Sequence, residues 1–137
     1  MILWDTGPLY AAFDRQDKHH EASAVLMRQT TPPLLVPAPV VIETCYHLAK
    51  HLGGRAEVTL LKSFQTGDLA MVTPTKSDFD RAVELVERYA GFPLGITDAY
   101  VVAIAERLNI TQLATIDRRH FLAVTPHHCP GFELLPA

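Results

Sequence analysis

Four acidic residues of this chain stand where an α/β protein places its chemistry: Asp5, Glu43, Asp98 and Asp117. Asp5 directly follows the apolar run 2–4, and Asp117 directly follows the apolar run that ends at residue 116. Parallel α/β sheets bind ligands just beyond the carboxyl ends of their strands. If the four side chains converge there, their hard oxygen atoms form a site for a divalent cation such as Mg²⁺.

Each acid also has a simpler interpretation when it is taken alone. Glu43 lies on a predicted helix, 39–52, opposite an apolar seam, where it would be a solvated side chain near the positive end of the helix dipole. That seam comprises Val41, Cys45, Leu48 and Leu52. Asp98 can serve the start of the predicted helix 97–108, and an Asp after a strand is often a turn residue. Two acids at strand ends and two at helix starts make these separate explanations less economical than one metal site.

The rest of the sequence predicts the elements that position these acids. Short, nearly continuous apolar runs predict strands covered by helices on both faces, at 2–4, 34–36, 69–72 and 112–116, with a last edge strand at 132–135. Helical patterns separate them, at 8–14, 17–29, 39–52, 55–67, 75–90 and 97–108, followed by a short helical turn after Asp117. This alternation predicts an α/β fold with a central, mostly parallel sheet of about five strands.

Composition narrows the class of protein. The chain has 137 residues and 48% hydrophobic residues, which suits a single domain spanning 1–137. Its formal net charge of −3 does not indicate a polyanion binder, so a nucleic-acid role requires bound metal or a local basic patch. Cys45 and Cys129 have no paired spacing, and no signal peptide or membrane span is evident. We therefore expect a cytoplasmic protein with reduced thiols and no membrane contact.

The ordered motifs around the four acids resemble those of a known family. They are Asp5-Thr6 after the first strand, Pro39-Val40-Val41-Ile42-Glu43, Gly95-Ile96-Thr97-Asp98-Ala99, and Ala114-Thr115-Ile116-Asp117-Arg118-Arg119-His120-Phe121. In this order they resemble a PIN-domain ribonuclease of the VapC toxin type, and the resemblance covers essentially the whole chain. It implies a three-layer α/β/α fold in which Asp5, Glu43, Asp98 and Asp117 gather around one or two Mg²⁺ ions, with Mn²⁺ able to substitute.

The resemblance also implies a function and partners. The expected activity is Mg²⁺-dependent endoribonuclease cleavage of single-stranded or looped RNA by metal-activated water, as the toxin of a type II toxin–antitoxin pair, with a small antitoxin and a homodimeric state. Two alternatives stay open: an RNA-maturation nuclease without a toxin role, and a catalytically silent PIN module that binds RNA or protein. The family often has Ser where this chain has Gly7, which leaves Thr6, Thr115 or water to complete the outer shell.

Other chemistry-bearing residues have less specific patterns. Arg118, Arg119 and His120 follow Asp117 and either contact phosphates or are surface charges. Lys50, His51 and Arg55 are interpreted as charges near a helix C-terminus. The aromatic residues Trp4, Tyr10, Phe13 and Tyr100 are interpreted as packing rather than base-stacking residues. Adjacent His127, His128 and Cys129 lack the spacing of a zinc site.

Overall fold

The centre of the protein is a five-stranded sheet in which every observed pairing is parallel. The computed structural model describes residues 1–92 and 94–136. The strand order is β3-β2-β1-β4-β5. The strands are β1 (Ile2–Trp4), β2 (Leu34–Pro37), β3 (Leu69–Val72), β4 (Gln112–Ala114) and β5 (Glu133–Leu135). Because β1 lies between β2 and β4, the chain reverses its direction of travel across the sheet at this strand.

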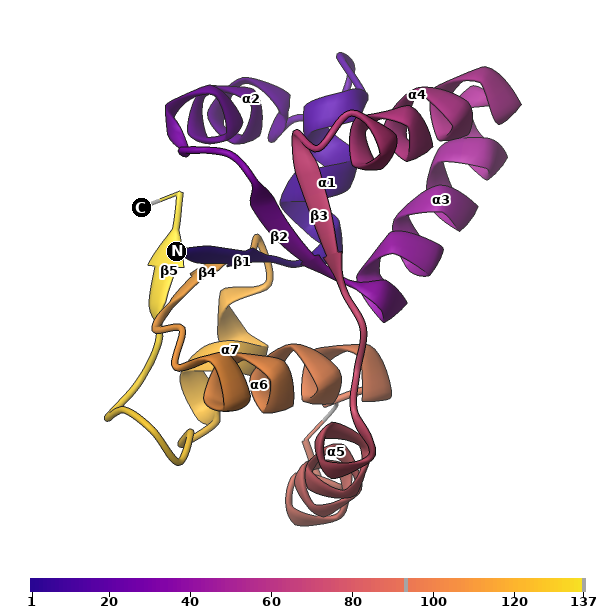
Figure 1. The fold of residues 1–137 in the computed structure, drawn as a ribbon. Coiled ribbons are helices and arrows are strands. Elements are labelled where there is room, and N and C mark those ends of the chain that lie inside the picture. Colours follow the sequence, from indigo (N-terminus) through magenta and orange to yellow (C-terminus); the bar gives the residue numbers. More distant parts are fainter. Residues whose placement is uncertain (93, 137) are drawn as a thin grey trace.

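Helices cover both faces of the sheet. They are α1 (Thr6–Phe13), α2 (His20–Gln29), α3 (Ala38–Leu52), α4 (Gly54–Gln65), α5 (Lys76–Arg88), α6 (Ile96–Leu108) and α7 (Arg118–Ala123). Figure 1 shows α1 to α4 on one side of the sheet and α5 to α7 on the other. The predicted three-layer α/β/α architecture is confirmed. In the described part of the chain, none of the helices has the length and apolarity that crossing a bilayer requires.

The apolar runs of the sequence form the core that was predicted from them. Leu3 and Trp4 of β1 and Leu113 of β4 are fully buried, because helices pack on both faces of these strands. The helix α6 buries five consecutive residues from Val101 to Ala105. One part of the predicted seam of α3 is wrong: Leu52 is 44% exposed, since it lies at the last residue of the helix, next to Gly53.

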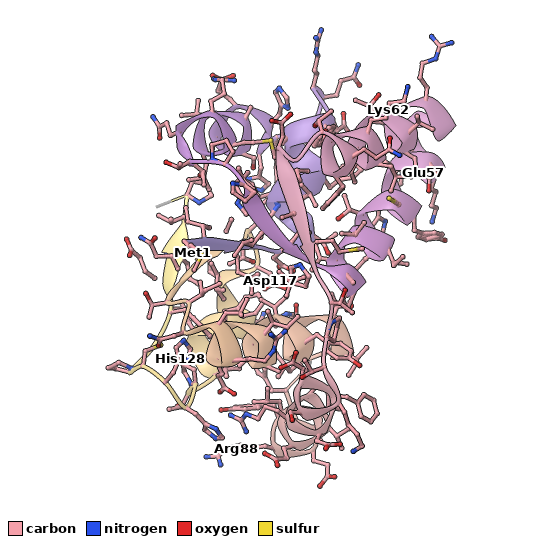
Figure 2. The ribbon with its side chains drawn as sticks, in the orientation of Figure 1. Met1, Glu57, Lys62, Arg88, Asp117 and His128 are labelled. Atoms are coloured by element: carbon pink, nitrogen blue, oxygen red, sulfur yellow. The ribbon has the colours of Figure 1, made fainter. Side chains whose placement is uncertain are left out.

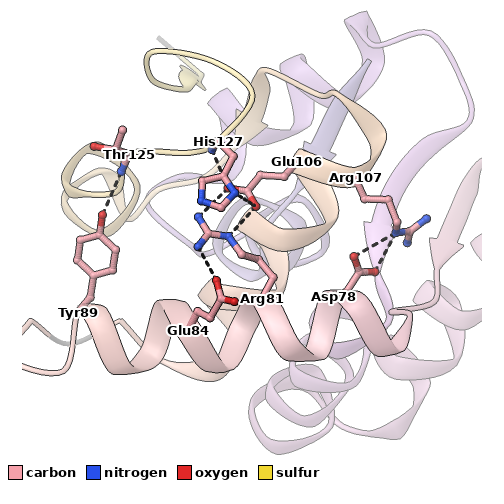
Figure 3. A network of polar contacts seen from close by, with 8 residues as sticks. All are labelled: Asp78, Arg81, Glu84, Tyr89, Glu106, Arg107, Thr125 and His127. Atoms are coloured by element: carbon pink, nitrogen blue, oxygen red, sulfur yellow. Dashed lines mark hydrogen bonds and ion pairs between the residues drawn. The ribbon is translucent and has the colours of Figure 1, made fainter.

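Ion pairs join α5, α6 and the chain that follows α7. Arg81 on α5 donates from Nε to Glu106 Oε1 of α6 at 2.8 Å and from Nη2 to Glu106 Oε2 at 3.0 Å. Arg107 Nε donates to Asp78 Oδ2 at 2.9 Å, and the backbone N–H of His127 donates to Glu106 Oε2 at 2.8 Å (Figure 3). The two arginines therefore clamp α5 to α6, and Glu106 also holds the segment before β5.

Candidate active site

The first two acids are brought together by the pairing of β1 with β4. Trp4 pairs with Ala114, so the next residues, Asp5 and Thr115, leave the sheet side by side. The Asp5 backbone N–H extends the ladder by donating to Ala114 O at 2.9 Å. The Thr115 hydroxyl donates to Asp5 Oδ2 at 2.9 Å and accepts from the Asp117 backbone N–H at 3.1 Å. A single buried hydroxyl thus connects both strand-end acids.

The carboxyl group of Asp5 is buried and its pKa is strongly raised. It is only 6% exposed, and it stands at the N-cap of α1 without making a side-chain capping hydrogen bond. Burial raises the pKa of Asp5 from its ordinary value of 3.8 to about 7, with a further contribution from the negative charge of Asp98. The Thr6 backbone N–H and the Thr115 hydroxyl oppose that shift in part. A carboxyl group that is this costly to ionise alone is suited to a nearby cation.

An open cleft of about 660 Å³ collects all four predicted acids on its wall. Asp5 and Asp117 enter it from the ends of β1 and β4, Glu43 from the second turn of α3, and Asp98 from the first turn of α6. Glu43 is half-buried rather than fully solvated. Asp117, which Figure 2 labels, has a side chain that is 48% exposed. The structure therefore places the quartet at one end of the sheet, as its positions in the sequence predict.

His120 joins two of these acids, although the sequence offered it only as a phosphate contact or a surface charge. Its Nδ1 lies 3.0 Å from Asp98 Oδ2 and 2.7 Å from Asp117 Oδ2. Burial is the main cause that raises the pKa of Asp98 above its ordinary range; His120 counteracts it and the charge of Asp117 adds to it. The sequence did contain a signal for one of these contacts. Asp117 and His120 are three residues apart, and residues at that spacing on a helix lie on the same face.

A second group of cleft residues was also missed, and it lies on α3 and α1. His47 and His51 follow Glu43 at intervals of four residues, so all three lie along one face of α3. Both histidines line the cleft, together with Tyr10 of α1. The interpretations of Tyr10 as a packing residue and of His51 as a charge near the helix end did not place them at the site.

The predicted outer residues have different surroundings. Thr6 lines the cleft, and its buried hydroxyl has no hydrogen-bond partner among the described residues. Arg118 Nη1 donates to Pro136 O at 3.2 Å, and the Arg119 guanidinium lies 5.8 Å from the centre of the Phe92 ring. Both arginines lie outside the lining of the cleft. Among the five outer and bridging candidates, Thr6, Thr115 and His120 are therefore at the site in this structure, and Arg118 and Arg119 are not.

Packing explains why residue 7 is a glycine. A Cβ atom built at Gly7 would lie 3.3 Å from both Cβ and Cδ1 of Ile116, which is tighter than most real contacts. Ile116 is the residue between Thr115 and Asp117, so this contact presses α1 against the segment that carries the second strand-end acid. Glycine at this position lets the two segments approach.

The donor set of the cleft fits a hard divalent cation. It offers carboxylate oxygens, one orphaned hydroxyl and a buried carboxyl group whose pKa is raised to about 7. Across residues 1–92 and 94–136, however, no three His, Cys, Asp or Glu side chains are drawn together closely enough to hold an ion as they stand. The Nε2 atom of His128 lies 2.6 Å from Ile110 O and 3.7 Å from Cys129 Sγ.

Comparisons with known proteins give the class to which this fold and cleft belong. Residues 2–125 match the PIN domain, so the chain belongs to the PIN-domain family. Within that family it is of the VapC type: it is 30% identical over 135 residues to "Ribonuclease VapC26" of Mycobacterium tuberculosis, covering 98% of this chain and 100% of that protein. Ribonucleases of this family generally depend on divalent metal ions.

Solved structures share the fold. The crystal structure of VapC20 from Mycobacterium tuberculosis, described as a sarcin–ricin loop cleaving toxin, has a TM-score of 0.83 at 21% identity and covers 90% of this chain and 95% of that chain. A toxin–antitoxin complex from Klebsiella pneumoniae has a TM-score of 0.67 at 16% identity and covers 90% and 92% of the two chains. At these identities the structures establish the architecture alone.

Proposed function

We propose that this chain is a Mg²⁺-dependent endoribonuclease that acts as the toxin of a toxin–antitoxin pair. The observation that carries the proposal is the gathering of Asp5, Glu43, Asp98 and Asp117 in one cleft, with a buried Asp5 whose pKa is raised to about 7. The relative named as a ribonuclease supports RNA as the substrate. The expected substrate is single-stranded or looped RNA, and the expected products carry 5′-phosphate and 3′-hydroxyl ends.

The residues of the cleft have distinct roles in this proposal. Asp5 and Asp98 would be direct ligands of the divalent cation, with Glu43 and Asp117 binding a second ion or orienting water. When bound, the cation lowers the pKa of water and offsets negative charge on the phosphate. Thr115 fixes the orientation of the Asp5 carboxyl group through its 2.9 Å hydrogen bond. His120 holds the carboxylates of Asp98 and Asp117 in place through its Nδ1 atom.

The electrostatics of the chain support a requirement for metal. The net charge is −3, and five carboxyl groups, those of the quartet and of Asp17, line the cleft. An RNA phosphate would meet repulsion there unless divalent ions reverse the local charge. Mn²⁺ accepts similar oxygen ligands and is expected to replace Mg²⁺.

We further propose two protein partners. The solved toxin–antitoxin complex with this fold supports a small antitoxin that binds this chain. A homodimer is the second expected assembly, and the exposed large apolar side chains of α3 and α5 support it. These are Ile42, Tyr46 and Leu52 on α3 and Phe79 and Val83 on α5. Light scattering after size-exclusion chromatography would give the mass of the isolated protein, and a monomer at all concentrations would contradict the homodimer.

One experiment tests the nuclease and separates it from the alternatives. Wild-type protein and the Asp5→Asn variant are incubated with cellular RNA in Mg²⁺ or in EDTA, and new RNA ends are mapped. We expect cleavage by the wild type in Mg²⁺ only, and none by the variant. Equal cleavage by Asp5→Asn would contradict the assignment of Asp5, and no cleavage by the wild type would favour a binding module.

Expression in a bacterial host tests the toxin role. A toxin arrests growth in the wild-type form and not as Asp5→Asn, whereas a maturation nuclease cleaves RNA without arrest. The matched control is His127→Gln, because the His127 side chain is 68% exposed and lies outside the lining of the cleft. This control is expected to behave as the wild type in both assays.

A further inference from the structure

Three rings form one wall of the cleft, and the metal-site proposal gives them no role. They belong to Tyr10 of α1 and to His47 and His51 of α3, here called the ring wall. The two imidazoles are nearly parallel, at an angle of 11°, with centres 6.2 Å apart. The Tyr10 ring stands almost perpendicular to both, at 81° and 76°, with centres 6.4 Å and 6.2 Å away. The wall is therefore a preformed arrangement of flat surfaces.

The ring wall adjoins the acids directly. His47 is one helical turn beyond Glu43, and His51 one turn beyond His47, on the same face of α3. An RNA strand with one phosphate at the four acids would therefore place its neighbouring nucleotides against these rings. His51 is exposed and His47 is half-buried, so neither imidazole is fully enclosed in the core.

The Tyr10 hydroxyl is held by the residue that follows α1. It donates to Asp14 Oδ2 at 2.7 Å, and Asp14 Oδ1 in turn accepts from the Gln16 backbone N–H at 3.0 Å. This bond fixes the orientation of the ring. Tyr10, which lines the cleft, thus already uses its hydroxyl hydrogen in the bond to Asp14.

Flat rings beside a phosphodiester-cleaving site suit the planar part of the substrate. Base–aromatic stacking is tolerant of sequence, because each nucleobase has a π face. A phosphate group is a poorer ligand for the ring wall than a base. Asp17 and Glu43 line the same cleft, and their negative charges repel anions. A base parallel to the imidazoles would meet the Tyr10 ring at its edge, in the perpendicular arrangement that aromatic pairs favour.

We propose that the ring wall of Tyr10, His47 and His51 is a nucleobase-stacking subsite, which holds an unpaired base next to the phosphodiester bond positioned at the quartet. This inference rests on the proposed ribonuclease function and deepens it. It also gives the cleft a reason to take single-stranded or looped RNA, since only an unpaired base exposes its face to the wall.

The test is RNA binding by full-length variants that all carry Asp5→Asn, so that the RNA stays intact. The probes are a fluorescein-labelled oligoadenylate of about a dozen nucleotides and a ribose–phosphate oligomer of the same length without bases. Fluorescence anisotropy in Mg²⁺ gives the affinities of the parent, His47→Ala, His47→Phe, His51→Ala and the remote control His127→Ala. Because His51 is exposed, its substitution leaves the fold intact, and thermal unfolding checks the others.

Stacking predicts a specific pattern of affinities. His47→Ala and His51→Ala should each weaken oligoadenylate binding roughly 5- to 100-fold. His47→Phe should retain binding within about threefold, because it keeps a planar ring without charge. The base-free oligomer should bind weakly and equally to all variants, and His127→Ala should match the parent.

Several results would overturn the subsite. These are an unchanged affinity in the alanine variants, a loss in His47→Phe as large as in His47→Ala, an equal loss for the base-free oligomer, or no binding of oligoadenylate by the parent. The proposed function is judged separately by cleavage with the wild-type protein. Wild-type cleavage with any of these results would reject the subsite and keep the nuclease, whereas absence of cleavage would reject both.

Discussion

Two aspartates occupy the same position in neighbouring helices and have opposite surroundings. Asp78 is the third residue of α5 and Asp98 the third residue of α6. Asp78 completes a capping box with Thr75 and pairs with Arg107, so both of its oxygens have donors. Asp98 faces the cleft, where its neighbours are other acids and His120. Helix position alone therefore does not decide whether a carboxylate stabilises the fold or serves a site.

The same contrast extends to the two regions that contain these residues. In the α5–α6 network, burial alone would raise the pKa of Glu106, but bonds from Arg81 and the His127 N–H outweigh it and lower that pKa below its ordinary range. In the cleft, burial and the charge of Asp98 raise the pKa of Asp5 to about 7. Arginines that belong to the fold neutralise the first region. In the second region, the described residues that line the cleft include five carboxylates and no arginine, which is the arrangement expected of acids that bind a cation.

The largest expected effect comes from exchanging the two aspartates for asparagine. Asp98→Asn should lower Mg²⁺-dependent RNA cleavage about 1000-fold while leaving stability nearly unchanged, because it removes a ligand charge without unpairing an arginine. Asp78→Asn should keep the cleavage rate of the folded protein but lower the free energy of unfolding by about 3 kcal/mol, since Arg107 loses its buried partner.

Both quantities should be measured on both variants. Initial cleavage rates on a common RNA give the catalytic effect, and urea unfolding gives the stability. The assignment of Asp98 to the site and of Asp78 to the fold would be wrong if Asp98→Asn were as destabilised as Asp78→Asn, or if Asp78→Asn lost activity while folded.

A second, smaller effect compares two glutamates. Glu106→Gln should lower the free energy of unfolding by about 2–3 kcal/mol, because Arg81 is then left without its charged partner in a site where the Glu106 side chain is only 10% exposed. Glu43→Gln should change it by less than about 0.5 kcal/mol, since Glu43 lies in the wall of an open cleft. Urea unfolding midpoints check both values, and equal destabilisation would show that Glu43 is structural.

The sequence predicted the fold and the quartet because both depend on local patterns. Continuous apolar runs mark strands that are covered on both faces, and an acid directly after such a run must lie at the carboxyl end of the sheet. Asp5 and Asp117 follow this rule, and the three-layer architecture is confirmed. The exposed end of the α3 seam at Leu52 was mispredicted, since helix periodicity does not tell where the contact with the core ends.

What the sequence could not predict depends on contacts between distant segments. His120 reaches Asp98 across 22 residues of sequence, and Thr115 reaches Asp5 across 110. Tyr10 meets His47 and His51 only because α1 packs beside α3. Arg118 and Arg119 seemed suited to phosphate from their position after Asp117, yet the start of α7 directs them toward Pro136 and Phe92.

The pH dependence of stability offers a third comparison, because the two regions shift pKa values in opposite directions. Asp5 ionises at about pH 3.8 in the unfolded chain and about 7 in the folded one, so metal-free stability should fall as pH rises through this window. Glu106 has a lowered folded pKa, so its contribution is present above its unfolded pKa and is lost as pH falls through the folded value.

Asp5→Asn isolates the first of these effects. In EDTA it should raise the free energy of unfolding above pH 7 by about 4 kcal/mol and have little effect near pH 4, where Asp5 is neutral in the folded protein. Mg²⁺ should stabilise the wild type more than the variant, because a ligand that binds the folded state raises its stability and the variant keeps only three of the four acids. Stabilisation by Asp5→Asn that is independent of pH would contradict the raised pKa of Asp5.

The smallest expected effect concerns Gly7, at the border between the cleft and the core. Gly7→Ser places a Cβ atom 3.3 Å from Ile116, and the resulting overpacking should cost about 1 kcal/mol. Ile116→Val removes the Cδ1 atom, one of the two close contacts, so the double variant Gly7→Ser with Ile116→Val should be more stable than the sum of the single changes predicts. Thermal unfolding of the four proteins in the cycle gives this coupling.

Since Ile116 connects Thr115 to Asp117, a strained Gly7→Ser protein should also lose some cleavage activity, and Ile116→Val should restore part of it. Additive stabilities would show that Ile116 yields without cost, and the glycine would then have to be explained by the cleft rather than by packing.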